Sequence, residues 1–151
     1  MSSRVDFAFG APDRLRAACQ VVRKHYVAGR KLIIYHSEPK FLADFDDLLW
    51  GFDPSAFVPH VMAEHPHADH TPILLYSQNP QPHSAAQAPY WLLNLDPQCP
   101  PLPSPFARIL EIVSEDETDK QAARSRWRQY KQHHCAVHAH QLPPYDSPNY
   151  T

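Results

Sequence analysis

The sequence predicts a single α/β domain built around a largely parallel β-sheet. Two observations carry this prediction. Short apolar segments typical of strands alternate with longer segments of helical periodicity, and 151 residues with 43% hydrophobic content are enough for about one core. Strands joined through helices usually lie parallel, with right-handed crossovers. We therefore expect one domain that spans residues 1–151.

The first half of the chain alternates regularly between strand and helix. In order, it predicts a strand at 4–9, a helix at 13–28, a strand at 31–36 and a helix from Ser37 to Gly51. Gly10 and Pro12 end the first strand, and Gly29 is placed as the C-terminal cap of the first helix. Pro39 suits the first turn of the second helix, because its missing N–H has no partner there.

The second half is interrupted by loops that are rich in proline and histidine. It predicts strands at 73–76, 90–95, 109–113 and 135–140, and a helix at 114–132. Ser114 and Glu117 have the spacing of a capping box, which places the start of this helix at Ser114. Residues 57–60 form a short apolar patch, and 63–70 form a loop with several histidines.

Composition argues against several classes of function. With a formal charge of −2, the molecule as a whole has no positive electrostatic field that would attract a phosphate backbone. We therefore expect no direct contact with nucleic acid. Three glycines cannot form a GxGxxG or GxxxxGK loop, so we expect no nucleotide cofactor. The sequence lacks a signal peptide and any apolar run of about 18 residues, which predicts a cytoplasmic protein without a membrane segment. Three separated cysteines without a CxxC pair predict reduced thiols.

The run HPHADH at 65–70 is similar to the zinc-binding H-x-H-x-D-H pattern of metallo-β-lactamase-like hydrolases. A catalytic zinc needs about three protein ligands and an open position for water. This motif follows no predicted strand, and eleven histidines make a chance grouping in a surface loop the simpler interpretation. Our second hypothesis is a metal-dependent hydrolase that uses His65, His67, Asp69 and His70. Our first hypothesis, which rests on the resemblance described below, assigns no metal to the protein.

The predicted helix at 114–132 carries a cationic stripe next to an apolar one. The cations are Lys120, Arg124, Arg128 and Lys131, and the apolar residues are Ala123, Trp127 and Tyr130. One interpretation is a solvated basic face that flanks the core. The other is a pocket for a carboxylate, because guanidinium groups bind carboxylates in a bidentate fork and the aromatic ring adds apolar contact. An acidic peptide end would suit such a surface.

A second cluster combines large apolar side chains at a helix end and in the following loop. It consists of Trp50, Phe52, Phe57 and Val58. Three aromatic residues outside the periodic core positions predict an exposed interface with a tryptophan anchor. The alternative is that these residues close one end of the core.

Three short runs resemble the chi subunit family of the bacterial DNA polymerase III clamp loader. They are LLW at 48–50, SAFVPH at 55–60 and ARSRWRQYK at 123–131, and the resemblance covers nearly the whole chain. It implies a three-layer α/β/α domain, Rossmann-like but without a phosphate-binding glycine loop. It also implies an accessory subunit of the polymerase that has no catalytic activity of its own and no cofactor.

The resemblance further implies two protein partners. The psi subunit of the clamp loader would bind Trp50, Phe57 and Val58, and the acidic C-terminal tail of single-stranded DNA-binding protein would bind Val113, Arg124, Trp127 and Arg128. At the last two positions the family usually has another aromatic residue and a lysine. We expect a monomer alone and a heterodimer with psi, and the family suggests a DNA-repair helicase as a further partner.

Overall fold

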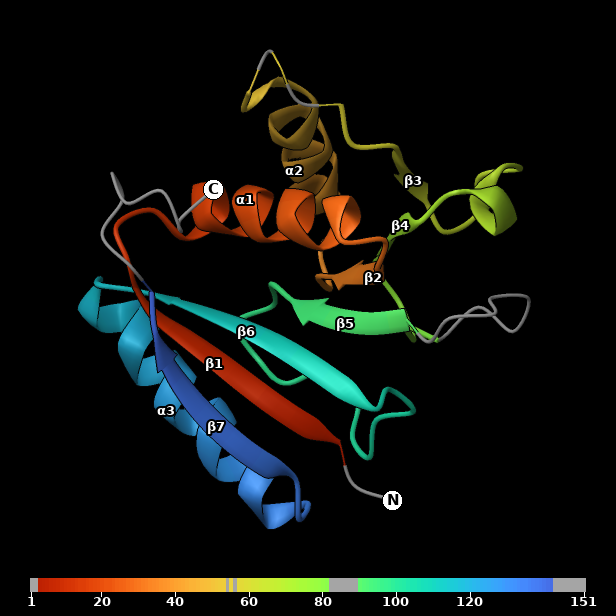
Figure 1. The fold of residues 1–151 in the computed structure, drawn as a ribbon. Helices are drawn as coiled ribbons and strands as arrows, with labels where there is room; N and C mark the ends of the chain where they lie inside the picture. The colour runs from red at the N-terminus through yellow and green to blue at the C-terminus, as the bar shows by residue number, and fades with distance from the viewer. Residues whose placement is uncertain (1–2, 54, 56, 82–89, 143–151) are drawn as a thin grey trace.

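A parallel β-sheet forms the middle of the computed structural model, which describes residues 3–53, 55, 57–81 and 90–142 (Figure 1). Within these residues the elements are β1 (Arg4–Ala11), α1 (Arg14–Val27), β2 (Lys31–Tyr35), α2 (Pro39–Gly51), β3 (His60–Met62), the 3-10 turn η1 (Ala68–His70), β4 (Ile73–Tyr76), β5 (Tyr90–Asn94), β6 (Arg108–Ser114), α3 (Glu117–Gln132) and β7 (Ala136–Gln141). The strand order is β3-β4-β2-β5-β6-β1-β7, and every pair is parallel. The predicted α/β class is confirmed.

Helices cover both faces of the sheet, as a three-layer domain requires. Residues of α1 and α2 share one hydrophobic cluster with one face of the strands, whereas Ala123 and Tyr130 of α3 belong to a second cluster on the other face. Figure 1 shows α3 behind β6, β1 and β7, with α1 and α2 on the opposite side of the sheet. The strands at the centre are therefore buried on both faces and consist largely of apolar residues.

Local signals at the helix ends explain where α1 and α2 begin and end. The Asp13 side chain accepts hydrogen bonds from the backbone N–H groups of Leu15 and Arg16 at the start of α1. Gly29 follows the helix with a φ of 79°, a conformation that glycine adopts without strain. Pro39 occupies the first turn of α2, as expected.

The predicted start of the third helix is wrong by three residues. Ser114 remains in β6, and α3 begins at Glu117 with Asp116 as its N-cap. The Asp116 carboxylate accepts from the backbone N–H of Asp119 at 3.1 Å, and the Asp119 carboxylate accepts from the N–H of Ser114 at 2.7 Å. These two aspartates take the roles that the sequence suggested for Ser114 and Glu117, because β6 remains paired with β1 as far as Ser114, past a register shift in β1 between Phe9 and Ala11.

The segment after α2 also differs from the prediction. His60 begins β3, a three-residue strand paired with β4 that the apolar patch did not predict. Of the two interpretations of the apolar cluster, Val58 fits the one that closes the core, because it is 2% exposed and packs in the cluster formed with α1 and α2. None of the helices in the described part of the chain is long and apolar enough to cross a membrane.

A candidate peptide-binding pocket at the carboxyl ends of the strands

A pocket lies where the connections of two neighbouring strands diverge. β1 continues into α1 on one face of the sheet, and its neighbour β6 continues into α3 on the other face. In open parallel sheets this topological switch point, at the carboxyl ends of the strands, is the usual place for a ligand. Phe9 and Gly10 near the end of β1, together with Val113 and Glu115 near the end of β6, contribute to the pocket.

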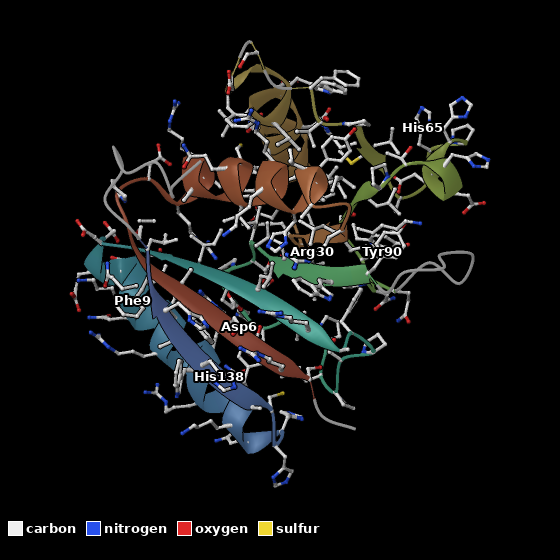
Figure 2. The ribbon with its side chains drawn as sticks, in the orientation of Figure 1. Asp6, Phe9, Arg30, His65, Tyr90 and His138 are labelled. Atoms are coloured by element: carbon white, nitrogen blue, oxygen red, sulfur yellow. The ribbon has the colours of Figure 1, made fainter. Side chains whose placement is uncertain are left out.

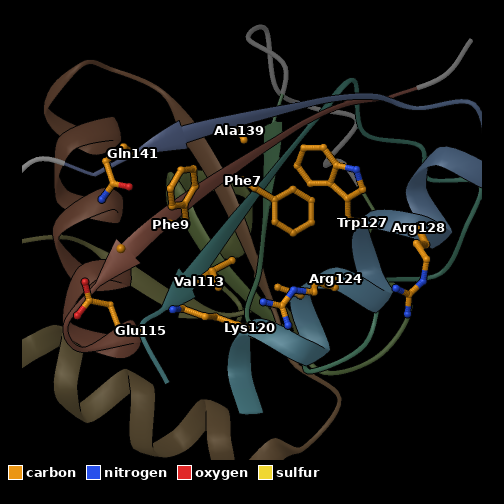
Figure 3. Close-up of a pocket in the computed structure, with 12 residues that line it drawn as sticks. Phe7, Phe9, Val113, Glu115, Lys120, Arg124, Trp127, Arg128, Ala139 and Gln141 are labelled. Atoms are coloured by element: carbon orange, nitrogen blue, oxygen red, sulfur yellow. The ribbon is translucent and has the colours of Figure 1, made fainter. Parts of the chain in front are cut away.

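This pocket has a volume of about 760 Å³ and opens between the sheet and α3 (Figure 3). Its lining residues come from β1, β6, α3 and β7, with Glu115 beyond the end of β6: Phe7, Phe9, Gly10, Val113, Glu115, Lys120, Ala123, Arg124, Trp127, Arg128, Ala139 and Gln141. All four residues that the sequence assigned to peptide binding, Val113, Arg124, Trp127 and Arg128, are among them. The structure therefore brings the predicted set into one cavity.

The floor and walls of the pocket are apolar and aromatic. The ring of Phe7 contacts that of Trp127 with centroids 5.1 Å apart, and Val113 is almost fully buried beneath the opening. Phe9 is 40% exposed, whereas Phe7, two residues earlier on β1, is buried. Exposed aromatic area in a concave site suits an apolar ligand group, because its burial removes that area from water.

Cations stand at the rim of this apolar cavity. Lys120, Arg124 and Arg128 follow one another at intervals of one helical turn on α3. Arg124 Nη1 lies 3.3 Å from Glu117 Oε1, and both side chains are mostly exposed. A ligand with an apolar tip and a nearby carboxylate would satisfy both parts of the site.

The helix starts beside the pocket are already occupied by carboxylates of the chain itself. Asp13 accepts N–H bonds at the start of α1, and Asp116 does so at the start of α3, where Glu117 and Asp119 add further negative charge. A free helix N-terminus would attract a phosphate group. These acids reduce that attraction, so the charge of the site comes from the cations of α3.

A buried polar network behind the pocket joins α3 to the sheet. Arg126 Nε donates to Glu111 Oε1 at 3.1 Å, while Tyr130 Oη and Asn94 Nδ2 donate to Glu111 Oε2 at 2.6 and 2.8 Å. Arg126 Nη1 also donates to the Pro97 carbonyl at 3.0 Å. Burial raises the pKa of Glu111, and these donors oppose the shift by stabilising the carboxylate. The network fixes Arg126 within the same stretch of α3 that carries Arg124, Trp127 and Arg128.

The sequence analysis missed this network, although a signal for it exists. Arg126 stands three residues after Ala123 and four before Tyr130, which is the spacing of a core position on α3. Glu111 interrupts the apolar run RILEIVS of β6. A lone acid in a buried strand followed by a lone arginine at a core position of the next helix predicts a pair, because a buried charge requires a partner.

Comparison with known proteins identifies the family. A model described as DNA polymerase III chi subunit, HolC, matches residues 1–138. The chain belongs to the DNA polymerase III chi subunit family. It is 29% identical over 145 residues to DNA polymerase III subunit chi of Pseudomonas aeruginosa. The aligned region covers 93% of this chain and 98% of that protein. The protein of the same name from Haemophilus influenzae is 28% identical over 117 residues, which are 76% of this chain and 77% of that protein. The one from Escherichia coli is 23% identical over 113 residues, which are 75% of this chain and 75% of that protein.

This family membership makes the chain a subunit of a replicative DNA polymerase. The resemblance that rested on three short runs is thereby confirmed over most of the chain. The coarser part of the predicted function, a role in DNA replication within DNA polymerase III, follows from it.

The second predicted site of this chi-family protein lies at the end of α2. Trp50 and Phe57 are 44% and 68% exposed, and their ring centroids are 5.5 Å apart. Behind them, the ring of the buried His60 lies 4.2 Å from that of Trp50. His60 Nε2 lies 2.7 Å from Asp46 Oδ1 on α2, and His60 Nδ1 donates to the Val58 carbonyl at 2.6 Å. Of the three predicted residues, Trp50 and Phe57 thus form the surface and Val58 supports it from the core.

The histidine-rich loop does not have the geometry of a metal centre. In the described part of the chain, no three histidine, cysteine, aspartate or glutamate side chains are grouped so that they could hold a metal ion. The rings of His65 and His67 contact each other at 5.4 Å, and His65 Nδ1 accepts from the backbone N–H of His67 at 3.0 Å. Figure 2 shows His65 at the outer side of this loop. The hydrolase hypothesis therefore has no support from the structure.

Proposed function

We propose that this chi subunit links the clamp loader to protein-coated single-stranded DNA. In this role the pocket at α3 binds the acidic C-terminal tail of single-stranded DNA-binding protein, and the Trp50–Phe57 surface binds psi. The protein contributes binding alone, without catalysis, cofactor or direct contact with nucleic acid, and acts in the cytoplasm. The observation that carries the proposal is the pocket, because an apolar cavity with arginines at its rim matches a peptide that ends in an acidic run and an apolar residue.

The chemistry of the pocket supports a chain end as its ligand. Such tails generally finish with acidic residues, an apolar tip and a terminal phenylalanine with a free carboxylate. Val113 and Trp127 offer the phenylalanine ring an apolar wall, while Arg124 and Arg128 lie one turn apart and reach a carboxylate or the acids before it. A site of this kind requires shape and charge together.

The surface at the end of α2 supports a different partner. Trp50 and Phe57 form an exposed aromatic pair, which suits the apolar core of a stable protein interface. We assign this surface to psi, which gives a heterodimer from a monomeric subunit. A DNA-repair helicase, which the family suggests, is a further partner in this proposal, with no surface assigned to it.

Calorimetric titration with a tail peptide tests the assignment of the pocket. Arg128→Ala should weaken binding by about 1.5 to 3 kcal/mol, because a charge-assisted hydrogen bond is lost, and Arg124→Ala should act in the same direction. Amidation of the peptide C-terminus should weaken binding to the parent protein. Added salt should do so as well, since the contact is partly exposed.

Lys40→Ala provides the matched control. Lys40 is an exposed cation on α2 that pairs with Asp44, so its replacement changes the net charge equally but far from the pocket. Its affinity for the peptide should equal that of the parent. Equal binding by the parent, Arg124→Ala and Arg128→Ala proteins, or no binding by the folded parent, would refute the pocket assignment.

A further inference from the structure

Among the described residues, the strand β7 forms an edge of the sheet beside the pocket. It stands last in the strand order and, among the described residues, pairs with β1 alone. Five of its six residues are exposed, and its sequence AVHAHQ contains no lysine, acid or proline. Natural proteins usually protect a long edge with such residues, because unpaired N–H and C=O groups attract a further strand.

The hydrogen bonds on the β1 side identify which backbone groups of β7 point away from the sheet. The N–H of Ala136 donates to the Ser3 carbonyl at 3.1 Å, and the N–H of Leu142 donates to the Phe9 carbonyl at 2.9 Å. In a regular parallel ladder, alternate residues direct both backbone groups to the same neighbour. The backbone N–H and C=O groups of residues 136, 138, 140 and 142 therefore face β1. Those of Val137, Ala139 and Gln141 face outward.

Two of these outward-facing residues also belong to the pocket. Ala139 and Gln141 line it together with Arg124 and Arg128. A peptide that leaves the pocket across β7 passes their free backbone groups at the usual strand spacing of about 4.8 Å. Every second side chain of that peptide would point toward α3, where the cations stand. β7 itself carries no acid that would repel a negatively charged segment.

We propose that β7 binds an extended acidic peptide as an added strand, with the outward N–H and C=O groups of Ala139 and Gln141 as its hydrogen-bond partners. This inference rests on the proposed function, since the added strand is the acidic segment that precedes the chain end held in the pocket. Main-chain pairing supplies affinity without a strict sequence, and the cations of α3 select for acidic residues. A second copy of β7 would bring no anion to Arg124 and Arg128.

Amide hydrogen exchange of the parent protein is the first test. In the free protein the outward N–H groups of Ala139 and Gln141 should exchange readily, and a saturating tail peptide should slow both by at least about tenfold. The N–H of Ala136, which already bonds to β1, serves as the internal control and should change little.

Backbone changes in the two partners form the second test. Tail peptides with one N-methylated amide each should lose at least about tenfold in affinity at every second position, because only alternate amides face β7. Ala139→Pro should weaken binding similarly, because it removes the outward N–H that the peptide would use. The variant should still fold, since proline is tolerated at an edge position whose N–H faces outward. His138→Ala, whose side chain is outside the pocket lining, should bind like the parent.

The outcomes separate this inference from the proposed function. If the parent binds the peptide, and neither N-methylation nor exchange at Ala139 shows an effect, the added strand is refuted and the pocket assignment stands. If the folded parent does not bind the peptide at all, both fail. A free protein that is dimeric, and monomeric after Ala139→Pro, would show that β7 pairs with its own copy and would overturn the inference. Should Ala139→Pro fail to fold, the N-methylated peptides decide with the parent protein.

Discussion

Arg124 already has an anionic partner at the mouth of the pocket. Its Nη1 lies 3.3 Å from Glu117 Oε1, with side chains that are 60% and 64% exposed. An exposed pair of this kind contributes at most about 1 kcal/mol. A peptide carboxylate that binds Arg124 must therefore replace Glu117 or share the guanidinium with it, and Glu117 acts as an internal competitor.

Glu117→Gln should strengthen binding of the tail peptide by up to about fivefold, because the competing charge is removed and the size of the side chain is retained. Calorimetric titration measures the change. In the Arg124→Ala background the same substitution should have little further effect, since the competition requires both partners.

Asp44→Asn is the matched control for this substitution. Asp44 pairs with Lys40 on α2, so the change removes an acid from an exposed ion pair on the other side of the sheet. Its effect on peptide affinity should be negligible. An equal gain from Asp44→Asn would mean that net charge, and not competition at Arg124, determines the effect.

At the scale of elements, Asp6 joins three neighbouring strands on the face of the sheet opposite α3. Its carboxylate accepts from Arg108 of β6 and lies against His140 of β7, each at 2.8 Å, and Arg4 of β1 adds a contact at 3.1 Å. Figure 2 shows Asp6 on β1 beside β7. Burial favours a raised pKa, but the hydrogen bonds from Arg4, His140 and Arg108 outweigh it and lower the pKa of Asp6 from 3.8 to about 2.

This lowered pKa predicts a specific loss of stability in acid. The carboxylate of Asp6 stabilises the folded state fully above its unfolded pKa near 4, and that contribution, about 2 kcal/mol, should disappear as the pH falls through 2. Urea unfolding between pH 5 and 2 measures it. Asp6→Asn should lower the free energy of unfolding at pH 7 and flatten the dependence below pH 4. Parallel curves for the parent and Asp6→Asn proteins would contradict this account.

At the scale of the whole molecule, the sheet separates the two proposed binding surfaces. Trp50 and Phe57 lie at the end of α2, and the pocket lies between the sheet and α3 on the opposite face. Because the two sites share no residue, their energetic effects should be additive. This independence is what a linker between two partners requires.

Trp50→Ala and Phe57→Ala should therefore weaken association with psi and leave affinity for the tail peptide unchanged. Loss of a central aromatic anchor costs about 2 kcal/mol or more. A pull-down of psi and a peptide titration measure both effects on the same protein. Val27→Ala, which removes an exposed apolar side chain from α1, is the control and should preserve both activities. Unchanged capture of psi by both aromatic variants would exclude this surface.

The sequence alone determined the features that depend on neighbours along the chain. Helical and strand periodicity located α1, α2, α3 and six of the seven strands in the described part of the chain closely, and Gly29 marked the end of α1 because caps act within one turn. Short motifs were sufficient to identify the family. The stripe of Lys120, Arg124 and Arg128 on α3 also followed from spacing alone, because a helix repeats every 3.6 residues.

Only the tertiary structure decided the features that depend on residues distant in the sequence. The burial of Val58, the pairing of Glu111 with Arg126 and the short strand β3 arise from packing between segments that no local pattern connects. The strand order placed β6 beside β1 and β7 at the edge, which created the pocket and brought Ala139 and Gln141 into its lining. Periodicity states which side of an element is apolar, but the neighbour that covers that side is chosen by the fold as a whole.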